Sequence, residues 1–221
     1  NDFAKESIQT INEIISTLYF LPENERLFIS SPSNRRNFID RLIFSYNKSY
    51  NKKINEYNKF IQERSKLLIQ NIFDESWLNQ LEKNISSYGL EIYAIRKVQI
   101  NFLIENLNTY LKNFNLPFNI SVKLDDTFYS DNTDQELYAQ ELKKNRKIDS
   151  LIGGAKVGPH KSDYIFYTND NFEVSQLSTG QQKTLILLIY LSQCEYLVNI
   201  KKKQPILLLD EVCSHLDDIN R

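Results

Sequence analysis

The stretch from Gln176 to Asp217 constrains the fold more than any other part of this chain. It contains a long apolar run, residues 185–198, then a lysine-rich turn, and then the aliphatic run Ile206-Leu207-Leu208-Leu209. The first run has the length of a helix. The second run follows Pro205 and is typical of a strand buried on both faces of a parallel sheet. A helix that leads into such a strand predicts an α/β fold.

Polar residues at both ends of this helix and strand suit nucleotide chemistry. Ser178-Thr179-Gly180-Gln181 precedes the helix, where a hydroxyl, free backbone N–H groups and the positive end of the helix dipole favour a phosphate. Asp210 and Glu211 follow the strand, at the edge where open α/β sheets bind their ligands. In this position Asp210 would hold Mg²⁺, usually through water, and Glu211 would polarise the attacking water. Either pattern alone is common, but the two in this order, joined by one helix and followed by Ser214-His215-Leu216-Asp217, form a specific combination.

These residues resemble the signature motif, Walker B strand and D-loop of the ABC-type ATPase superfamily. In that superfamily each nucleotide lies between the Walker A loop of one subunit and the signature motif of another. Thr179 stands where transporters usually have glycine, and Val212 stands where they mostly have proline. The helix between the two motifs is also longer than in transporters. All three features favour the chromosome-maintenance branch, which includes RecF and SMC proteins.

Composition limits the other function classes. The chain has 221 residues, 41% of them hydrophobic, and a net charge of −1, so it is neither disordered nor generally basic, and any nucleic-acid surface must be local. Cys194 and Cys213 form no extracellular disulfide pattern, and no signal peptide or membrane span is present, which favours the cytoplasm. The chain has no Gly-x-x-x-x-Gly-Lys-Ser/Thr motif. We therefore expect a piece of a longer protein, with its Walker A loop upstream and its C-terminal end missing.

The first half of the chain is predicted to be mainly helical. Apolar spacing predicts an amphipathic helix over Phe3–Tyr19, and residues 26–29 suggest a short extended segment. Two long helices, from Ser33 to about Ile72 and from Trp77 to about Phe114, are expected to form an antiparallel hairpin. This hairpin is far too short for the heptads of an SMC protein.

The second half is predicted to alternate strands and helices. Ile120–Leu124 alternates like a strand, Gln135–Asp149 has the pattern of a helix, and Tyr164–Tyr167 follows a turn as an aromatic strand.

Two further motifs make the resemblance to RecF specific. One is Ser31-Pro32-Ser33-x-Arg35-Arg36-x-Phe38-x-Asp40, and the other is Leu142-x-x-x-Arg146-x-x-Asp149 followed by Gly158-Pro159-His160. The RecF pattern usually continues with Arg-Asp-Asp, whereas this chain has Lys161-Ser162-Asp163, and lysine cannot make a bidentate arginine contact.

The resemblance implies an ABC-type ATPase head with an incomplete P-loop NTPase-like sheet and an inserted helical-hairpin arm. The implied division is residues 1–32 and 116–221 for the ATPase lobe and residues 33–115 for the arm.

The resemblance to RecF implies an ATP-dependent DNA-binding protein with ATPase activity that acts in recombinational and replication-gap repair and is linked to the SOS response. Such proteins dimerise with ATP and Mg²⁺, bind double-stranded and gapped DNA, hydrolyse ATP slowly, and load recombinase with RecO and RecR. They are cytoplasmic and associated with the nucleoid. We expect this stretch alone not to hydrolyse ATP.

The resemblance also assigns roles to individual residues. Ser178 and Gly180 would contact the γ-phosphate bound by the other subunit, and Gln181 would start the helix that aims these donors. Asp217 would face the same interface, while Asp210 would hold Mg²⁺ and Glu211 would be catalytic.

A DNA surface is expected on the helix from Ser33 to Lys66, which is rich in basic residues. An ordinary solvated helix face is the alternative, and the first two arginines could instead support the ATPase core. The candidate DNA contacts are Arg35, Arg36, Lys48, Lys52, Lys53 and Lys59.

Other readings stay open at this point. An SMC-like or other ABC-type ATPase head is one, and a DNA-binding scaffold with a degenerate ATP site is another. His160 could sense nucleotide, although a satisfied structural histidine beside a turn fits the pattern better.

Overall fold

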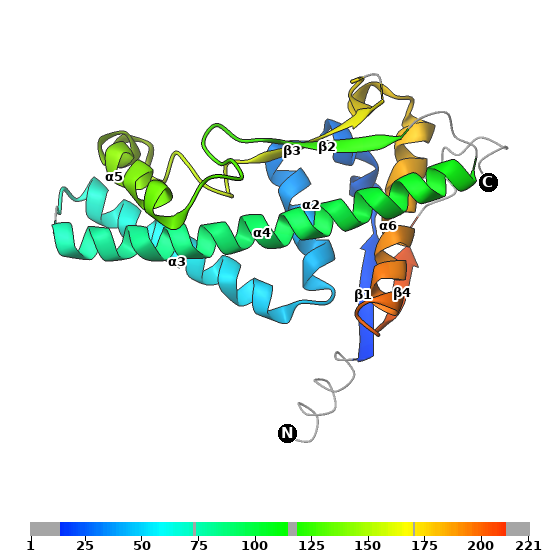
Figure 1. Ribbon diagram of the computed structural model, residues 1–221, viewed down its shortest axis with the longest axis horizontal. Coiled ribbons are helices and arrows are strands. Elements are labelled where there is room, and N and C mark those ends of the chain that lie inside the picture. The colour runs from blue at the N-terminus through cyan, green and yellow to red at the C-terminus, as the bar shows by residue number, and fades with distance from the viewer. Residues whose placement is uncertain (1–13, 73, 115–118, 170, 211–221) are drawn as a thin grey trace. The chain divides into compact units, whose positions relative to one another are not determined.

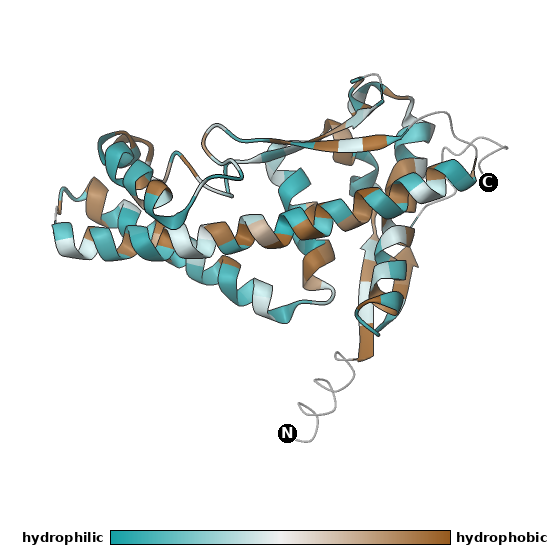
Figure 2. Ribbon diagram, in the orientation of Figure 1, coloured by the Kyte–Doolittle hydropathy of each residue, from teal (hydrophilic) through white to brown (hydrophobic). Residues whose placement is uncertain are grey.

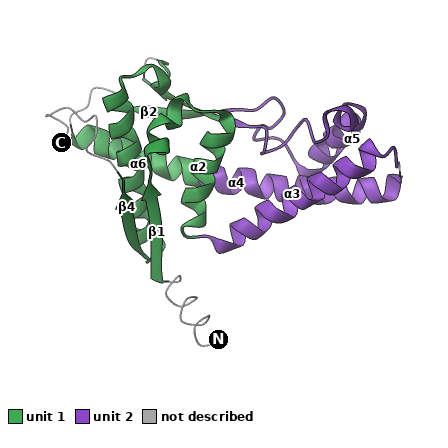
Figure 3. Cartoon of the chain, turned by 180° about the vertical axis from the view of Figure 1, so that it is seen from behind, with its two compact units in different colours: residues 1–46, 99–123, 164–221 green, residues 47–98, 124–163 purple. Residues whose placement is uncertain are grey.

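The computed structural model describes residues 14–72, 74–114, 119–169 and 171–210 (Figure 1). The chain divides into two compact units, which are described separately (Figure 3). Unit 1 comprises residues 1–46, 99–123 and 164–221, and unit 2 comprises residues 47–98 and 124–163. These bounds differ from the three-part division expected from the sequence, whose assignment of an ATPase lobe and an arm stays a prediction.

Unit 1 contains a two-stranded parallel sheet. Strand β1 (Ile15–Phe20) pairs with β4 (Gln204–Leu209), from Ile15 opposite Gln204 to Phe20 opposite Leu209. Helix α6 (Thr179–Asn199) packs on both strands, and β4 runs back beside it (Figure 1). Helices combined with a small parallel sheet confirm the predicted α/β class.

The helix predicted over Phe3–Tyr19 is wrong where the structure describes it, because residues 15–20 form β1. Ser16, Leu18 and Phe20 are buried while the residues between them are more exposed, which is the two-residue period of a strand. The partner that stabilises this strand is β4, far away in the sequence, so the local spacing of apolar residues was misleading. Residues 3–13 lie outside the described part of the chain.

The aliphatic run predicted to be a strand forms β4, but the expected burial on both faces is wrong for the described residues. Ile206 is 45% exposed, Leu208 48% and Leu209 51%, because α6 covers one face while the described residues leave the other largely open. In Figure 2 the ribbon of β4 is largely brown, the colour of hydrophobic residues.

Between these strands, unit 1 contains η1 (Pro22–Ile29) and α2 (Pro32–Phe44). The extended segment predicted at residues 26–29 is therefore wrong; the Asn24 side chain accepts a hydrogen bond from the Leu21 N–H and helps to form the 3₁₀ turn. Ser31 caps α2: its side chain accepts from the Asn34 N–H, and Pro32 occupies the first helical position.

The alternating segments predicted in the second half are confirmed. Strands β2 (Ile120–Asp125) and β3 (Asp163–Thr168) form a second two-stranded sheet, and η2 (Val174–Gln176) precedes α6. Helix α5 (Gln135–Ile152) belongs to unit 2 and ends at Gly153, whose φ of 73° closes the helix in the left-handed region.

Unit 2 contains the predicted antiparallel hairpin. The first helix is interrupted at residues 45–47, so that α3 (Lys48–Ile69) starts separately from α2, capped by Asn47. Helix α4 (Glu75–Asn113) is continuous and spans both units. Lys53 pairs with Glu91, and Arg64 with Glu82, so that rising numbers on α3 meet falling numbers on α4. Among the described residues, no helix is long and apolar enough to cross a membrane.

Candidate functional site

The first turn of α6 presents the predicted phosphate-binding residues to solvent. Ser178 is the N-cap: its Oγ accepts from the Gln181 N–H at 3.3 Å, and the Gln181 side chain accepts from the Ser178 N–H at 3.1 Å. This capping box holds the turn, while the N–H groups of Thr179 and Gly180 have no partner within the helix because of their position in it. An exposed hydroxyl therefore lies beside unpaired backbone donors at the positive end of a helix.

Gly180 is not required by packing inside the chain. A Cβ placed on Gly180 would meet nothing within 4 Å, whereas glycine in a helix costs stability relative to alanine. The space beside this residue is open, so its lack of a side chain matters only to something outside the described chain. A ligand or another molecule that approaches the backbone closely is the physical reason for such a glycine.

Buried polar side chains hold this helix start in place. The Gln182 amide donates to the carbonyls of Ser175, at 3.1 Å, and Leu177, at 2.8 Å, which fixes the loop before the helix. Lys183 is only 2% exposed and pairs with Glu25 of η1 at 2.5 Å. Sequence reasoning missed the Lys183–Glu25 pair, because nothing in the local pattern links two residues so far apart.

Asp210 lies where the carboxyl ends of β1 and β4 meet. Its N–H donates to the Phe20 carbonyl at 3.1 Å, which extends the pairing one step beyond the strand, and the residue is exposed. An exposed carboxylate at this edge is a suitable oxygen ligand for a hard cation. Glu211 and Asp217, the predicted catalytic and interface residues, lie outside the described residues.

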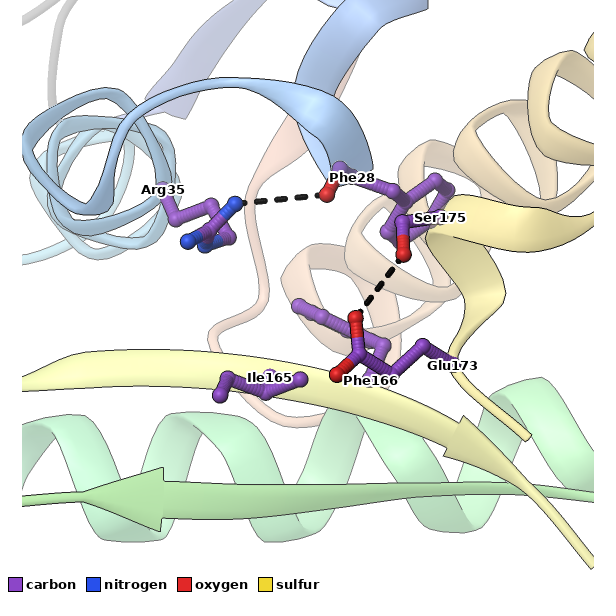
Figure 4. A pocket seen from close by; sticks show the side chains of 6 residues that line it. All are labelled: Phe28, Arg35, Ile165, Phe166, Glu173 and Ser175. Carbon is purple, nitrogen blue, oxygen red and sulfur yellow. Dashed lines mark hydrogen bonds between the residues drawn. The ribbon is translucent and has the colours of Figure 1, made fainter. Parts of the chain in front are cut away.

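Two cavities of unit 1 are too small for a nucleotide. One, of about 60 Å³, is lined by Arg35 and Glu173 among others, and Figure 4 shows both side chains at its wall. The other, of about 140 Å³, lies beyond the end of β1 and includes Glu23, Asn24 and Arg41. Ligand pockets generally exceed about 300 Å³. Neither cavity alone can therefore enclose ATP.

The predicted DNA contacts fall into different environments. Arg35 lies in α2 of unit 1, where its Nη1 donates to the carbonyls of Phe28 at 3.2 Å and Ser30 at 2.5 Å, and Arg36 is half-buried on the same helix. This geometry favours the alternative in which Arg35 supports the fold. Lys53 points towards α4 and pairs with Glu91.

The other predicted lysines share the exposed face of α3 in unit 2. Along α3, exposed side chains that can donate hydrogen bonds recur at alternating intervals of four and three residues. Residues at this spacing form a single stripe on one face of a helix. The stripe, called the α3 stripe below, extends over about 27 Å at 1.5 Å per residue. It comprises Lys48, Lys52, Asn55, Lys59, Gln62 and Lys66. Sequence reasoning counted Lys66 among the basic residues of this helix but missed the two amides, although the helical period alone would have found them. It also counted Arg64, which is buried at 1% exposure and therefore cannot contact DNA.

The motif Leu142…Arg146…Asp149 forms a buried ion-pair network in unit 2. Arg64, 1% exposed, donates to Glu82 at 2.9 Å, to Asp149 at 2.7 Å and to the Leu142 carbonyl at 2.6 Å. Arg146 completes the network with two bonds to Glu82 at 2.7 and 2.8 Å. These partners tie α3, α4 and α5 together, so this motif has a structural role in the chain.

Gly158-Pro159-His160 is held by the same unit. His160 Nε2 faces the Ala155 carbonyl at 2.9 Å, which can only accept, so this nitrogen carries the proton and Nδ1 accepts from the Tyr57 hydroxyl at 2.8 Å. Gly158 has a φ of 130°, and a Cβ there would come within 2.2 Å of the Tyr138 hydroxyl. The favoured interpretation of His160 as a satisfied structural histidine agrees with these contacts.

Comparisons with known proteins point to one family. No protein-family model matches the chain. The DNA replication and repair protein RecF of Rickettsia bellii (strain OSU 85-389) is 29% identical over 221 residues, and that of Rickettsia massiliae (strain Mtu5) is 30% identical over 222 residues. Both alignments cover 99% of this chain but only 61% of the relative, so the chain spans about three fifths of the length of the curated relatives it matches.

Solved structures give the same answer for the fold. The recombination mediator protein RecF of the RecFOR pathway, as RecF-ATP, superposes with a TM-score of 0.80 at 27% identity, covering 92% of this chain and 56% of that one. RecF-ATPrS also gives a TM-score of 0.80, at 26% identity, covering 93% of this chain and 57% of the other. The resemblance that the sequence motifs predicted is thereby confirmed: in sequence and in fold, this chain is similar to RecF along almost its whole length.

Proposed function

We propose that the whole protein is a RecF-type DNA-repair ATPase whose two copies enclose MgATP. The first turn of α6 in one copy would contact the γ-phosphate, and the carboxylates after β4 in the other copy would face the same nucleotide. The observation that carries this proposal is the first turn of α6, where Ser178 and Thr179 are exposed and Gly180 has open space beside it and no packing role among the described residues. The ATP complexes of RecF, which share this fold, support the choice of nucleotide.

Element lengths argue that one copy cannot supply both halves of the site. Helix α6 has 21 residues and β4 has 6, which corresponds to about 31 Å and about 20 Å. Because β4 returns along α6, Asp210 falls roughly 10 Å short of the Ser178 turn. A γ-phosphate bonded to this turn would therefore lie away from Asp210 of the same copy, and a second copy can bring its own carboxylates to it.

The catalytic roles follow from the chemistry of the donors. Asp210 would hold Mg²⁺ through its exposed carboxylate, and the cation would neutralise charge on the phosphates. Glu211 would orient and polarise the attacking water, Gln181 would fix the Ser178 turn, and Asp217 would face the dimer interface. The exposed apolar side chains of β4 support a further element of the whole protein that covers the open face of this sheet.

We assign the DNA contacts to the α3 stripe. Its four lysines and two amides donate to phosphate oxygens without reading base sequence, which suits double-stranded and gapped DNA of any sequence. Lys48, Lys52 and Lys59 are retained from the predicted set, whereas Lys53, already paired with Glu91, is expected to contribute less.

The cellular setting proposed is that of the RecFOR pathway. Slow hydrolysis would let the dimer open after it has loaded on DNA, and RecO and RecR would be its partners in loading recombinase. The place of action would be the cytoplasmic nucleoid, with an involvement in the SOS response.

Mass measurement of the whole protein tests the dimer directly. Sedimentation with and without MgATP should show a monomer that becomes a dimer only with nucleotide, and Glu211→Gln should hold the dimer by slowing hydrolysis. A protein that stays monomeric at saturating MgATP, with or without duplex DNA, contradicts the proposal.

Salt dependence tests the DNA surface. Reversing two charges with Lys52→Glu and Lys59→Glu should weaken binding to a duplex and lower the slope of log K against log salt by about 1.8, since each phosphate contact contributes about 0.9. As a control, Lys123→Glu reverses one charge on exposed β2, outside the stripe, and should leave the slope unchanged. Equal slopes for the stripe variant and the wild type would remove the stripe from the DNA interface.

A further inference from the structure

Four aliphatic side chains are exposed where α3 and α5 end in unit 2. Leu151 is 83% exposed, Ile69 and Ile152 are each 54% exposed, and Ile148 is 44% exposed. Single exposed aliphatic residues are ordinary, but a group of them on one surface marks an interaction site. These four residues are called the end patch below.

The two helices that carry the end patch finish side by side. Arg64 of α3 bonds to Asp149 of α5, and a Cβ on Gly153 would lie 3.9 Å from Ile69 Cδ1, so both helices run in the same direction to a common end. On α5, residues 148, 151 and 152 are spaced by three and four positions and therefore share one face. Figure 2 shows brown, apolar residues at the end of α3 beside α5.

Lysines surround this apolar surface. Lys66 lies one turn before Ile69 on α3, and Lys147 lies one turn before Leu151 on α5; both are exposed, and neither has an ion pair among the described residues. Lys144, 76% exposed, precedes Ile148 by one turn and pairs only with Glu141 of its own helix, at 3.3 Å. The rim of the patch is therefore positive.

The surface beneath the patch is rigid. The ion pairs from Arg64 to Glu82 and Asp149 are almost fully buried, and they fix α3 and α5 against α4 just below the exposed aliphatic residues. A preformed surface loses little conformational freedom when a partner binds, which favours affinity from a small contact area.

We propose that the end patch binds an acidic amphipathic helix of a partner protein. Aliphatic side chains gain nothing from phosphates, so DNA does not account for them, whereas an apolar helix stripe buries them. The lysine rim requires acidic residues beside that stripe, by charge complementarity. Four side chains on two helix ends match the few anchors of a helix-in-groove contact.

The test uses the whole protein and a fluorescein-labelled helical peptide with leucines at i, i+3, i+4 and i+7 and glutamates elsewhere. Fluorescence anisotropy should show saturable binding, and Leu151→Glu should weaken it at least tenfold. Leu151 is too exposed for this change to disturb the fold. The matched control is Leu137→Glu, a 50% exposed leucine in the first turn of α5, which should leave the affinity unchanged.

Other probes separate the alternative occupants. A peptide with the same leucines but lysines in place of glutamates should not bind, because the rim would repel it. The proposal fails if the acidic peptide does not bind, if Leu137→Glu weakens it as much as Leu151→Glu does, or if Leu151→Glu instead removes binding to a DNA duplex or to anionic lipid vesicles.

Discussion

Replacing Gly180 by alanine should have opposite effects on two quantities. It should raise the free energy of unfolding of the protein and weaken its ATP-dependent dimerisation. Among the residues that the structure describes, the new methyl group meets nothing within 4 Å, and Gly180 has no left-handed backbone angle. Alanine is the better helix former, so the substitution should stabilise the folded protein by about 0.5 kcal/mol. The fold by itself therefore gives no reason for glycine at this position.

At the proposed dimer interface the same methyl group would be harmful. Forcing an extra carbon into a closely packed contact costs about 2 kcal/mol, and a twofold dimer contains the contact twice. The free energy of dissociation of the ATP-bound dimer should therefore fall by about 4 kcal/mol. Its dissociation constant should rise by about a thousandfold.

Urea unfolding and sedimentation with MgATP measure the two effects on the whole protein. Gly154→Ala is the matched control, because a Cβ on Gly154 also meets nothing within 4 Å among the described residues, and this residue belongs to unit 2 and not to the proposed nucleotide site. A Gly180→Ala protein that dimerises as strongly as the wild type would refute the reasoning. So would a fall in its free energy of unfolding that is large enough to explain a loss of the dimer.

Further predictions concern the fold and its response to pH. Arg64→Met should lower the free energy of unfolding by about 3–5 kcal/mol, because it leaves the buried carboxylate of Asp149 without its arginine partner and removes one of the two arginines that bind Glu82. In the same urea titration the exposed control Lys66→Met should change little. Burial raises the pKa of Tyr190 to about 12, above the value near 10 expected when the chain is unfolded. Because Tyr190 ionises at lower pH in the unfolded chain than in the folded one, its contribution to the free energy of unfolding is complete below about pH 10. That contribution falls by about 2 kcal/mol between pH 10 and pH 12. Unfolding of Tyr190→Phe from pH 9 to 12 should show a shallower decline than the wild type, and parallel curves would rule out this assignment.

Local patterns were sufficient for much of the fold. The long helices α4, α5 and α6 and the strands β2 and β3 follow from apolar periodicity, and the caps Ser31 and Ser178 follow from residue types that accept hydrogen bonds from helix N–H groups.

The errors arose where distant contacts decide the structure. β1 is a strand because it pairs with β4, which lies at the other end of the sequence, so its own spacing could not reveal it. The partners Arg64 and Glu82 of the network around Asp149 come from separate helices, and no local motif joins them. For the site, the sequence placed the Ser178 turn and Asp210 on the correct elements, whereas the support from Lys183 and Glu25 emerges only in the folded chain.

The central claim is that each ATP site takes its Ser178 turn from one copy and its carboxylates from the other. Two inactive forms of the whole protein, Ser178→Arg and Glu211→Gln, can be mixed in equal amounts before MgATP is added. Half of the resulting dimers would contain both forms, and one of the two sites in each would be intact, so about a quarter of wild-type ATP turnover should return. If mixing restores no turnover while mixed dimers are shown to form, both halves of the site belong to the same copy and the account is contradicted.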